Sequence, residues 1–257
     1  MLKNTSRTFF IPINKLKGQL QDAVASAYLC MRAIDEIEDH PELPESYKVE
    51  KLMQVHEAFL SDQPIERIEQ LLTKEQQLLP EVTYRMAEWA SLCPESARTA
   101  VFRHTAKMSK QMAEWVAVDW KIETEADLDG YTYSVAGMVG EMLSDIWYWY
   151  DGTITDRNKA VAFGRGLQAV NILRNRQEDM ERGVNFFPVG WDMQQMVQYT
   201  LRNLSVADEY VRELKEGQPR TFCKIPLTLA HATVKLIKSG GNKLTRDTVL
   251  RLVNSIT

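Results

Sequence analysis

The feature that most constrains the fold of this chain is the placement of its prolines. The 257 residues include nine prolines, and none lies between Pro94 and Pro188. Proline interrupts helix interiors because it lacks a backbone N–H and clashes with the preceding turn. The proline-free stretch therefore leaves room for several unbroken helices. Glycine is also scarce, with 12 residues, and few segments alternate as β-strands do. The pattern predicts an all-α chain.

Apolar residues recur at spacings of three and four along most of the chain, which is the helical period. In residues 19–39, for example, the series includes Val24, Met31 and Ile34. No repeat, low-complexity tract or linker interrupts the pattern, so we expect a single all-α domain over residues 1–257. The predicted helices cover residues 19–39, 46–60, 65–72, 80–92, 95–121, 128–150, 156–183, 192–214 and 221–239, and a last one begins at 245.

Composition excludes several classes of protein. The net charge of −4 argues against a general nucleic-acid binder, which normally carries a basic excess. The three cysteines form no CxxC pair, which argues against a zinc ribbon or a disulfide scaffold and predicts a cytoplasmic protein. No apolar run approaches the length of about 18 residues that spans a membrane. We expect neither a signal core at residues 1–10 nor an anchor at residues 246–257. Peripheral membrane contact stays open, and no protein partner is evident.

The first segment that indicates chemistry is residues 32–39, which read RAIDEIED. Asp35 and Asp39 are four residues apart, so they share one face of the helix, about 6 Å apart along its axis. Like charges at this spacing repel, and an inward-facing pair needs a compensating cation. Mg²⁺ suits such a site because it often binds one or two carboxylates together with substrate phosphates. The alternative is a solvated acidic helix end.

The second segment is residues 166–179, which read GLQAVNILRNRQED. Gln168, Asn171, Asn175 and Asp179 fall at spacings of three and four and form one polar stripe between apolar neighbours. Amide side chains that are buried need hydrogen-bond partners. The stripe therefore predicts either a binding surface or a structural ladder of hydrogen bonds.

Together the two segments predict a cavity with metal-binding groups on opposite walls, between which a diphosphate could be clamped. Arg32 and Arg174 are the candidate anion partners, although each could instead form a surface ion pair. Ser6 and Arg7, near the N-terminus, could form part of a flexible lid.

Residues 131–143, which read YTYSVAGMVGEML, lie between the two polar segments. Gly137 and Gly140 predict a helix that bends or is closely approached there. The segment could serve tight helix packing, or it could leave room for a long apolar ligand. Tyr131 and Tyr133 could line such a pocket and stabilise a cation through their ring faces, or they could be ordinary core residues.

In these segments and over nearly its whole length, the chain resembles the squalene/phytoene synthase family, the head-to-head prenyl transferases. Four segments carry the resemblance in the same order: SRTF at residues 6–9, RAIDEIED at 32–39, YTYSVAGMVGEML at 131–143, and LQAVNILR at 167–174 followed by Glu178 and Asp179. The set is specific, whereas each piece alone would be weak.

The resemblance implies an isoprenoid-synthase helical bundle around a central cavity. It also implies that the acidic motifs bind Mg²⁺ and the diphosphate of farnesyl or geranylgeranyl diphosphate. On this basis the candidate catalytic residues are Asp35, Asp39, Asp179 and Tyr131. The candidate metal ligands are Asp35, Asp39, Asn171, Asn175 and Asp179, and the candidate substrate-binding residues are Ser6, Arg7, Arg32, Gln168, Asn171 and Arg174.

The chain departs from the family pattern at three positions. The second acidic motif normally opens with aspartate, whereas this chain has Asn175, a neutral and weaker Mg²⁺ ligand. The family pattern G-R-x-Y-x-P becomes GVNFFP at residues 183–188, so Val184 replaces an arginine and Phe186 replaces a tyrosine. A cation and a hydroxyl are thus missing near the expected diphosphate.

These departures predict a reaction simpler than head-to-head condensation. Condensation needs two diphosphates, whereas loss of one diphosphate followed by capture of water needs only one. The sequence therefore predicts a Mg²⁺-dependent prenyl diphosphate phosphatase that converts farnesyl diphosphate to farnesol. The alternatives are a working synthase that makes squalene, dehydrosqualene or phytoene, and a non-catalytic lipid-binding or assembly protein.

Overall fold

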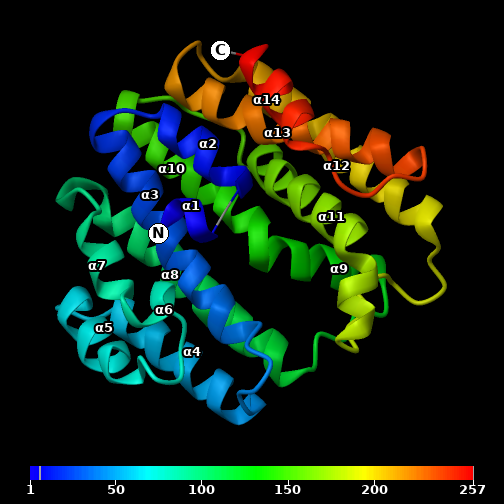
Figure 1. Cartoon of the computed structure of the whole chain (residues 1–257). Helices are drawn as coiled ribbons and strands as arrows, with labels where there is room; N and C mark the ends of the chain where they lie inside the picture. The colour runs from blue at the N-terminus through cyan, green and yellow to red at the C-terminus, as the bar shows by residue number, and fades with distance from the viewer. Residues whose placement is uncertain (6, 257) are drawn as a thin grey trace. The chain divides into compact units, whose positions relative to one another are not determined.

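The computed structural model describes residues 1–5 and 7–256, and Figure 1 shows their helices. No strand occurs in these two ranges, so the prediction of an all-α chain is confirmed. The chain divides into two compact units. Unit 1 is Met1–Asp119 with Tyr148–Tyr150, and unit 2 is Trp120–Trp147 with Asp151–Thr257. The expectation of a single domain stays a prediction.

Unit 1 is built around α3, which packs against α4, α6, α7 and α8, while α4 packs along α8. Its core contains Ile34, Ile37, Leu52, Val101 and Met112, each fully buried. Its helices are α1 (Leu2–Thr5), α2 (Arg7–Lys15), α3 (Gly18–Glu38), α4 (Glu45–Phe59), α5 (Pro64–Leu72), η1 (Thr73–Glu75), α6 (Glu81–Tyr84), α7 (Met86–Ser91) and α8 (Glu95–Ala117).

Prolines mark where helices of unit 1 begin. Pro44, Pro80 and Pro94 directly precede α4, α6 and α8, and Pro64 is the first residue of α5. The first turn of a helix tolerates proline because its N–H groups have no partner within the helix. These four prolines therefore set where α4, α5, α6 and α8 begin.

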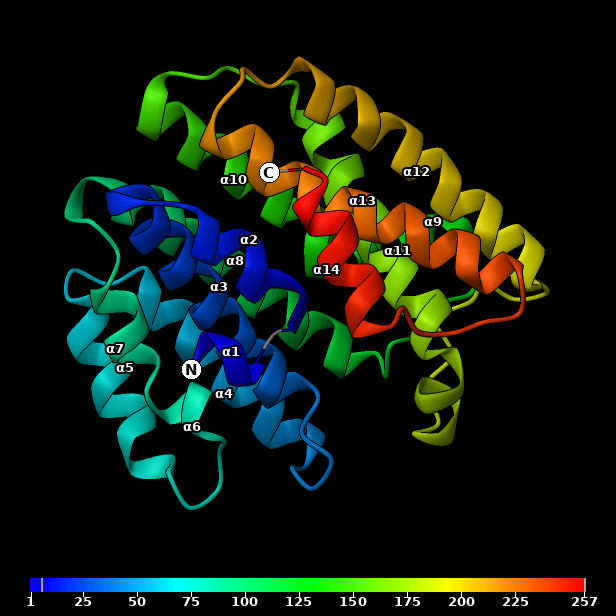
Figure 2. The same ribbon diagram turned by 45° about the horizontal axis from the view of Figure 1, so that its top comes forward.

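Unit 2 is organised by α11, which packs against α12, α13 and the π-helical segment η2. Figures 1 and 2 show α12 and α13 side by side, with α14 against α13. The aromatic side chains of Trp147, Tyr199 and Tyr210 are fully buried in its core. The helices of this part are α9 (Glu125–Thr132), η2 (Tyr133–Gly137), α10 (Met138–Asp151), α11 (Arg157–Glu181), α12 (Met193–Glu213), α13 (Gln218–Lys238) and α14 (Arg246–Asn254).

The predicted bend of residues 128–150 is a π-helix over Tyr133–Gly137, between α9 and α10. The glycines here serve close packing. A Cβ atom on Gly140 would lie 1.9 Å from the carbonyl oxygen of Ala160, and one on Gly164 would lie 1.9 Å from that of Ala136. The backbone of a neighbouring helix fills the space at both positions, α11 at Gly140 and η2 at Gly164, so at Gly140 the segment serves tight packing and leaves no room for an apolar ligand.

Most predicted helices begin and end within three residues of the observed ones. The helix predicted for 80–92 is broken at Arg85, and the one predicted for 95–121 ends at Ala117. Two residues with left-handed backbone, Asp119 at φ 52° and Trp120 at φ 47°, follow that end. The sequence did not predict α1 or α2. Among the described helices, none combines the length and apolar character needed to cross a bilayer.

Candidate functional site

The first acidic motif occupies the last turn of α3 in unit 1. Asp35 and Asp39 lie on successive turns, and the Asp39 backbone N–H donates to the Asp35 carbonyl at 2.8 Å. Ile34 and Ile37 bury the other side of this turn in the core. The Asp35 side chain is 28% exposed, whereas Asp39 is exposed. The prediction that the two carboxylates share a helix face therefore holds, with Asp35 nearer the interior.

The surroundings of Asp35 disfavour its charged form. Loss of hydration raises the pKa of this carboxyl to about 7, the nearby Arg32 guanidinium opposes that rise, and the negative charges of Asp39 and Glu36 add to it. Arg32 Nη1 lies 3.8 Å from Asp35 Oδ2, and its other terminal nitrogen donates to Glu36. Near neutral pH the carboxyl is partly protonated, so a divalent cation bound here would displace a proton.

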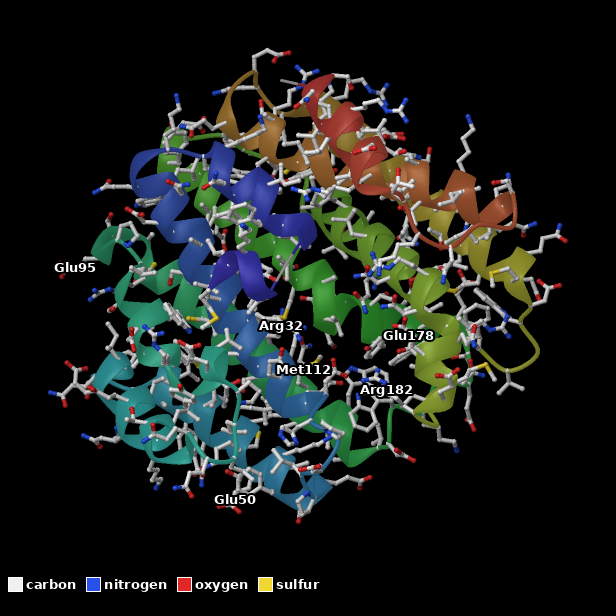
Figure 3. The ribbon with its side chains drawn as sticks, in the orientation of Figure 1. Arg32, Glu50, Glu95, Met112, Glu178 and Arg182 are labelled. Atoms are coloured by element: carbon white, nitrogen blue, oxygen red, sulfur yellow. The ribbon has the colours of Figure 1, made fainter. Side chains whose placement is uncertain are left out.

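Arg32, the predicted anion partner, is labelled in Figure 3 and lies on α3 one turn before Asp35. Its Nε atom is buried and has no hydrogen-bond partner in the described part of the chain. A buried donor without a partner is unfavourable. The guanidinium therefore has hydrogen-bonding capacity that its contacts with Asp35 and Glu36 leave unused.

The second motif lies on α11 in unit 2, where the four stripe residues are all half-buried. Asn171 Nδ2 donates to Gln168 Oε1 at 3.3 Å, so the predicted structural ladder is present between these two amides. Asn175 Oδ1 accepts from Arg174 Nε at 3.1 Å. The position where the family pattern has an aspartate thus presents an amide oxygen to a guanidinium.

Asp179 is held rigidly at the C-terminal end of α11. Its carbonyl accepts the Val184 N–H at 3.0 Å, and the Gly183 N–H donates to Met180 at 3.0 Å. Together with the left-handed backbone of Gly183, at φ 83°, these bonds form a Schellman cap. The Asp179 side chain is 13% exposed and accepts from Arg182 Nη2 at 3.0 Å. The sequence reasoning did not single out Arg182, although its spacing of three residues from Asp179 on a helix was a usable signal.

Tyr131 is buried in unit 2, where its ring stacks on Phe186 with centroids 4.5 Å apart and planes at 18°. Phe186 therefore fills its position with a packed ring in place of the family's tyrosine. Tyr133 donates from its hydroxyl to Glu141 Oε2 at 2.8 Å, and Arg176 lies over the Phe187 ring at 4.2 Å. Tyr131 is thus a core residue of unit 2, and its catalytic role stays a prediction.

The predicted residues fall into two groups that the structure describes separately. Asp35, Asp39 and Arg32 come together on α3. The residues of the second group are Tyr131, Gln168, Asn171, Arg174, Asn175 and Asp179, in unit 2. Ser6 and the side chain of Arg7 lie outside the described residues.

The donor atoms of the two motifs are carboxylate and amide oxygens, which are the ligands that Mg²⁺ prefers. Within residues 1–5 and 7–256, no three acidic, histidine or cysteine side chains converge to hold a metal ion. Each motif by itself therefore offers one or two carboxylate ligands, which fits a metal that binds together with substrate phosphates.

A groove of about 560 Å³ in unit 2 runs between α11, the start of α12 and the end of α13. Arg174 lines it, but none of the four stripe residues does. At 100° per residue, Leu173, Gln177 and Met180, which also line the groove, lie on the face of α11 opposite Asn171, Asn175 and Asp179. The groove is therefore separate from the polar stripe.

Comparison with known proteins places these motifs in context. The model of a family described as squalene/phytoene synthase matches residues 2–191. Squalene synthase of Bos taurus is 29% identical over 259 residues, covering 91% of this chain and 61% of the bovine protein. Squalene synthase ERG9 of Candida albicans is 27% identical over 300 residues, covering 98% of this chain and 65% of the fungal protein. The chain spans less than two thirds of the length of these relatives.

The fold is also similar to solved structures. A complex of TcSQS with the ligand BPH1237 superposes with a TM-score of 0.81 at 25% identity, covering 100% of this chain and 84% of the other. A complex of TcSQS with E5700 gives a TM-score of 0.79. The expected isoprenoid-synthase fold is therefore confirmed.

Proposed function

The chain belongs to the squalene/phytoene synthase family, and from this premise we propose that it is a Mg²⁺-dependent enzyme that joins two prenyl diphosphates head to head. The observation that carries the proposal is the retention of Asp35 and Asp39 on α3 and of Asp179 on α11, within a chain similar to squalene synthases. The sequence alone favoured a phosphatase. The relatives support the synthase better, because those cited are named squalene synthases.

Both motifs would contribute ligands for the metal and the diphosphates. These ligands would be the carboxylates of Asp35, Asp39 and Asp179 and the amide oxygens of Asn171 and Asn175. When bound, Mg²⁺ would neutralise the charge that develops on the departing diphosphate.

The chain's own side chains would do the remaining work. The Arg32 and Arg174 guanidinium groups would bind diphosphate oxygens, because their planar donor forks match phosphate geometry. The stacked rings of Tyr131 and Phe186 would present π faces to the positive charge of an allylic cation. Packing of these rings would also exclude water, which would otherwise add to the cation and give a prenyl alcohol.

A prenyl diphosphate phosphatase is the second candidate, and Asn175 is the observation that favours it. The amide brings no charge to the metal, and its oxygen already accepts a hydrogen bond from Arg174. Val184 and Phe186 remove a further cation and a hydroxyl. A site with weaker metal binding and fewer diphosphate contacts would ionise one prenyl diphosphate more readily than it would bind and condense two. A purely lipid-binding role is least supported, because three of the four aspartates of the two motifs remain.

Product analysis distinguishes these functions. Purified protein is incubated with radiolabelled farnesyl diphosphate and Mg²⁺, with and without a reduced nicotinamide as hydride donor, and the hexane extract is separated by chromatography. A thirty-carbon hydrocarbon supports the synthase, whereas farnesol as the sole product replaces it with the phosphatase. Absence of turnover with retained binding would favour the lipid-binding role. The Asn175→Asp variant is the matched comparison, since a gain of hydrocarbon would show that the amide limits condensation.

We further propose a cytoplasmic location. All three cysteines are buried free thiols, as a reducing compartment would maintain them. Peripheral contact with a membrane surface is compatible with this location, because a prenyl product would partition into lipid.

A further inference from the structure

We propose that Arg182 is a diphosphate-binding residue that the Asp179 carboxylate holds in place until Mg²⁺ binds. On this account the guanidinium competes with the metal in the free protein and cooperates with it once diphosphate arrives. The inference rests on the proposed function, because it requires Asp179 to be a metal ligand.

The contact between the two side chains is asymmetric. Arg182 Nη2 donates to Asp179 Oδ1 at 3.0 Å, and the arginine side chain is 48% exposed while the aspartate is 13% exposed. The Schellman cap at Gly183 fixes the backbone around Asp179. The backbone of Asp179 is therefore fixed, and its carboxylate is the less exposed partner of the pair.

Arg182 is the C-cap of α11, and two further acidic residues lie in the last turn of that helix. Figure 3 shows Glu178 beside it, and both Glu178 and Glu181 are exposed. Glu181 Oε1 accepts from Gln177 Nε2 at 3.1 Å. Arg182 is also the sole cationic residue in the sequence between Arg176 and Trp191. Val184 brings no charge, so the cation missing from the family pattern at position 184 is available two residues earlier.

A metal ion and Arg182 would compete for the same oxygen. Mg²⁺ binds carboxylate oxygens at about 2.1 Å, and a guanidinium hydrogen-bonded to Oδ1 repels the incoming ion. An ion pair with one largely exposed partner is weak, so loss of the Arg182 guanidinium should change metal affinity by no more than about fivefold. Removing the guanidinium should thus tighten binding of Mg²⁺ alone.

When diphosphate is bound, Arg182 would no longer oppose Mg²⁺ but would help to hold the same ligand. A phosphate that shared the metal with the Asp179 carboxylate would lie next to the guanidinium that donates to Oδ1. Arginine binds phosphate through two parallel charge-assisted hydrogen bonds. Removing Arg182 should thus weaken binding of diphosphate in the presence of Mg²⁺, by about tenfold or more.

The test is calorimetric titration of the full chain, first with Mg²⁺ alone and then with inorganic pyrophosphate at saturating Mg²⁺. Arg182→Gln should bind Mg²⁺ up to about fivefold more tightly and pyrophosphate at least about tenfold more weakly. Arg182→Lys, which keeps the charge but loses the two-pronged contact, should bind pyrophosphate with intermediate affinity. The matched control is Arg212→Gln, which removes an exposed arginine from the last turn of α12. It should leave both affinities unchanged.

Tighter binding of Mg²⁺ together with weaker binding of pyrophosphate identifies the proposed role, because damage to the fold would weaken the binding of both. Any other combination in Arg182→Gln overturns the proposal for Arg182. Asp179→Ala tests the underlying site separately. If Asp179→Ala binds Mg²⁺ and pyrophosphate as the unaltered chain does, the proposed metal site is wrong. If Asp179→Ala loses binding while Arg182→Gln behaves as the unaltered chain, only the role of Arg182 is wrong.

Discussion

Replacement of Gly140 by alanine tests how α10 packs on α11. An alanine Cβ at this position would lie 1.9 Å from the Ala160 carbonyl oxygen and 2.5 Å from its carbonyl carbon. These atoms belong to the backbone of α11, so no rotamer change can relieve the overlap. The two helices would have to separate by more than 1 Å, roughly, to restore ordinary van der Waals contact.

Two opposing contributions set the change in free energy of unfolding that Gly140→Ala causes. Overpacking in a core costs about 1–3 kcal/mol, and a backbone obstacle places this site at the upper end. The better helix propensity of alanine returns about 1 kcal/mol. The net loss in free energy of unfolding is therefore about 2 kcal/mol, which for a chain of this size lowers Tm by about 4–8 °C.

Circular dichroism at 222 nm (the helical band) during heating measures this change. Gly137→Ala is the matched control, because its new Cβ would meet only side-chain atoms, Tyr133 Cδ2 and Val161 Cγ1, both at 3.1 Å. Those side chains can shift, so Gly137→Ala should lower Tm by less than Gly140→Ala. An equal or higher Tm for Gly140→Ala would refute the described packing of α10 on α11.

Three further predictions concern the sites. The raised pKa of Asp35, about 7, means that the folded chain keeps a proton which the unfolded chain releases near the usual value of 3.8. The free energy of unfolding should thus fall as pH rises through this range, and Asp35→Asn should flatten that fall in urea titrations at several pH values. Phe186→Ala should lower the free energy of unfolding by about 3–5 kcal/mol in the same assay, because it removes a buried ring stacked on Tyr131. A loss of less than about 1 kcal/mol would contradict the stacking of these two rings in the core. Asn175→Asp should bind Mg²⁺ more tightly than the unaltered chain in calorimetry, since a carboxylate replaces an amide one turn from Asp179, and unchanged affinity would remove Asn175 from the ligand set.

The sequence predicted the helices well because periodicity and proline placement are local signals. Pro64, Pro80 and Pro94 stand at or next to helix starts, and the glycine-rich segment is where the helix becomes a π-helix. The break at Arg85 had no such signal. Neither the apolar period nor a proline marks that position, so one helix was predicted where α6 and α7 are separate.

The site was predicted in its residue types but not in its contacts. The spacing of Asp35 and Asp39 and the stripe of α11 follow from helix geometry, and both are observed on single faces. The partners of these residues depend on the tertiary environment. That Asn175 accepts from Arg174, and that Asp179 accepts from Arg182, could not be predicted from spacing alone. Whether Gly140 makes room for a ligand or for a neighbouring helix was equally undecided until the position of Ala160 was known.

The proposed function requires Asp35, Asp39 and Asp179 to act on a prenyl diphosphate through Mg²⁺. Release of pyrophosphate from farnesyl diphosphate measures it most directly, because both condensation and loss of a single diphosphate by C–O cleavage produce pyrophosphate. We expect the unaltered chain to release pyrophosphate only when Mg²⁺ is present, and we expect Asp35→Ala and Asp179→Ala to lose that release. Release that persists without Mg²⁺, or that survives either substitution, would contradict the proposed function.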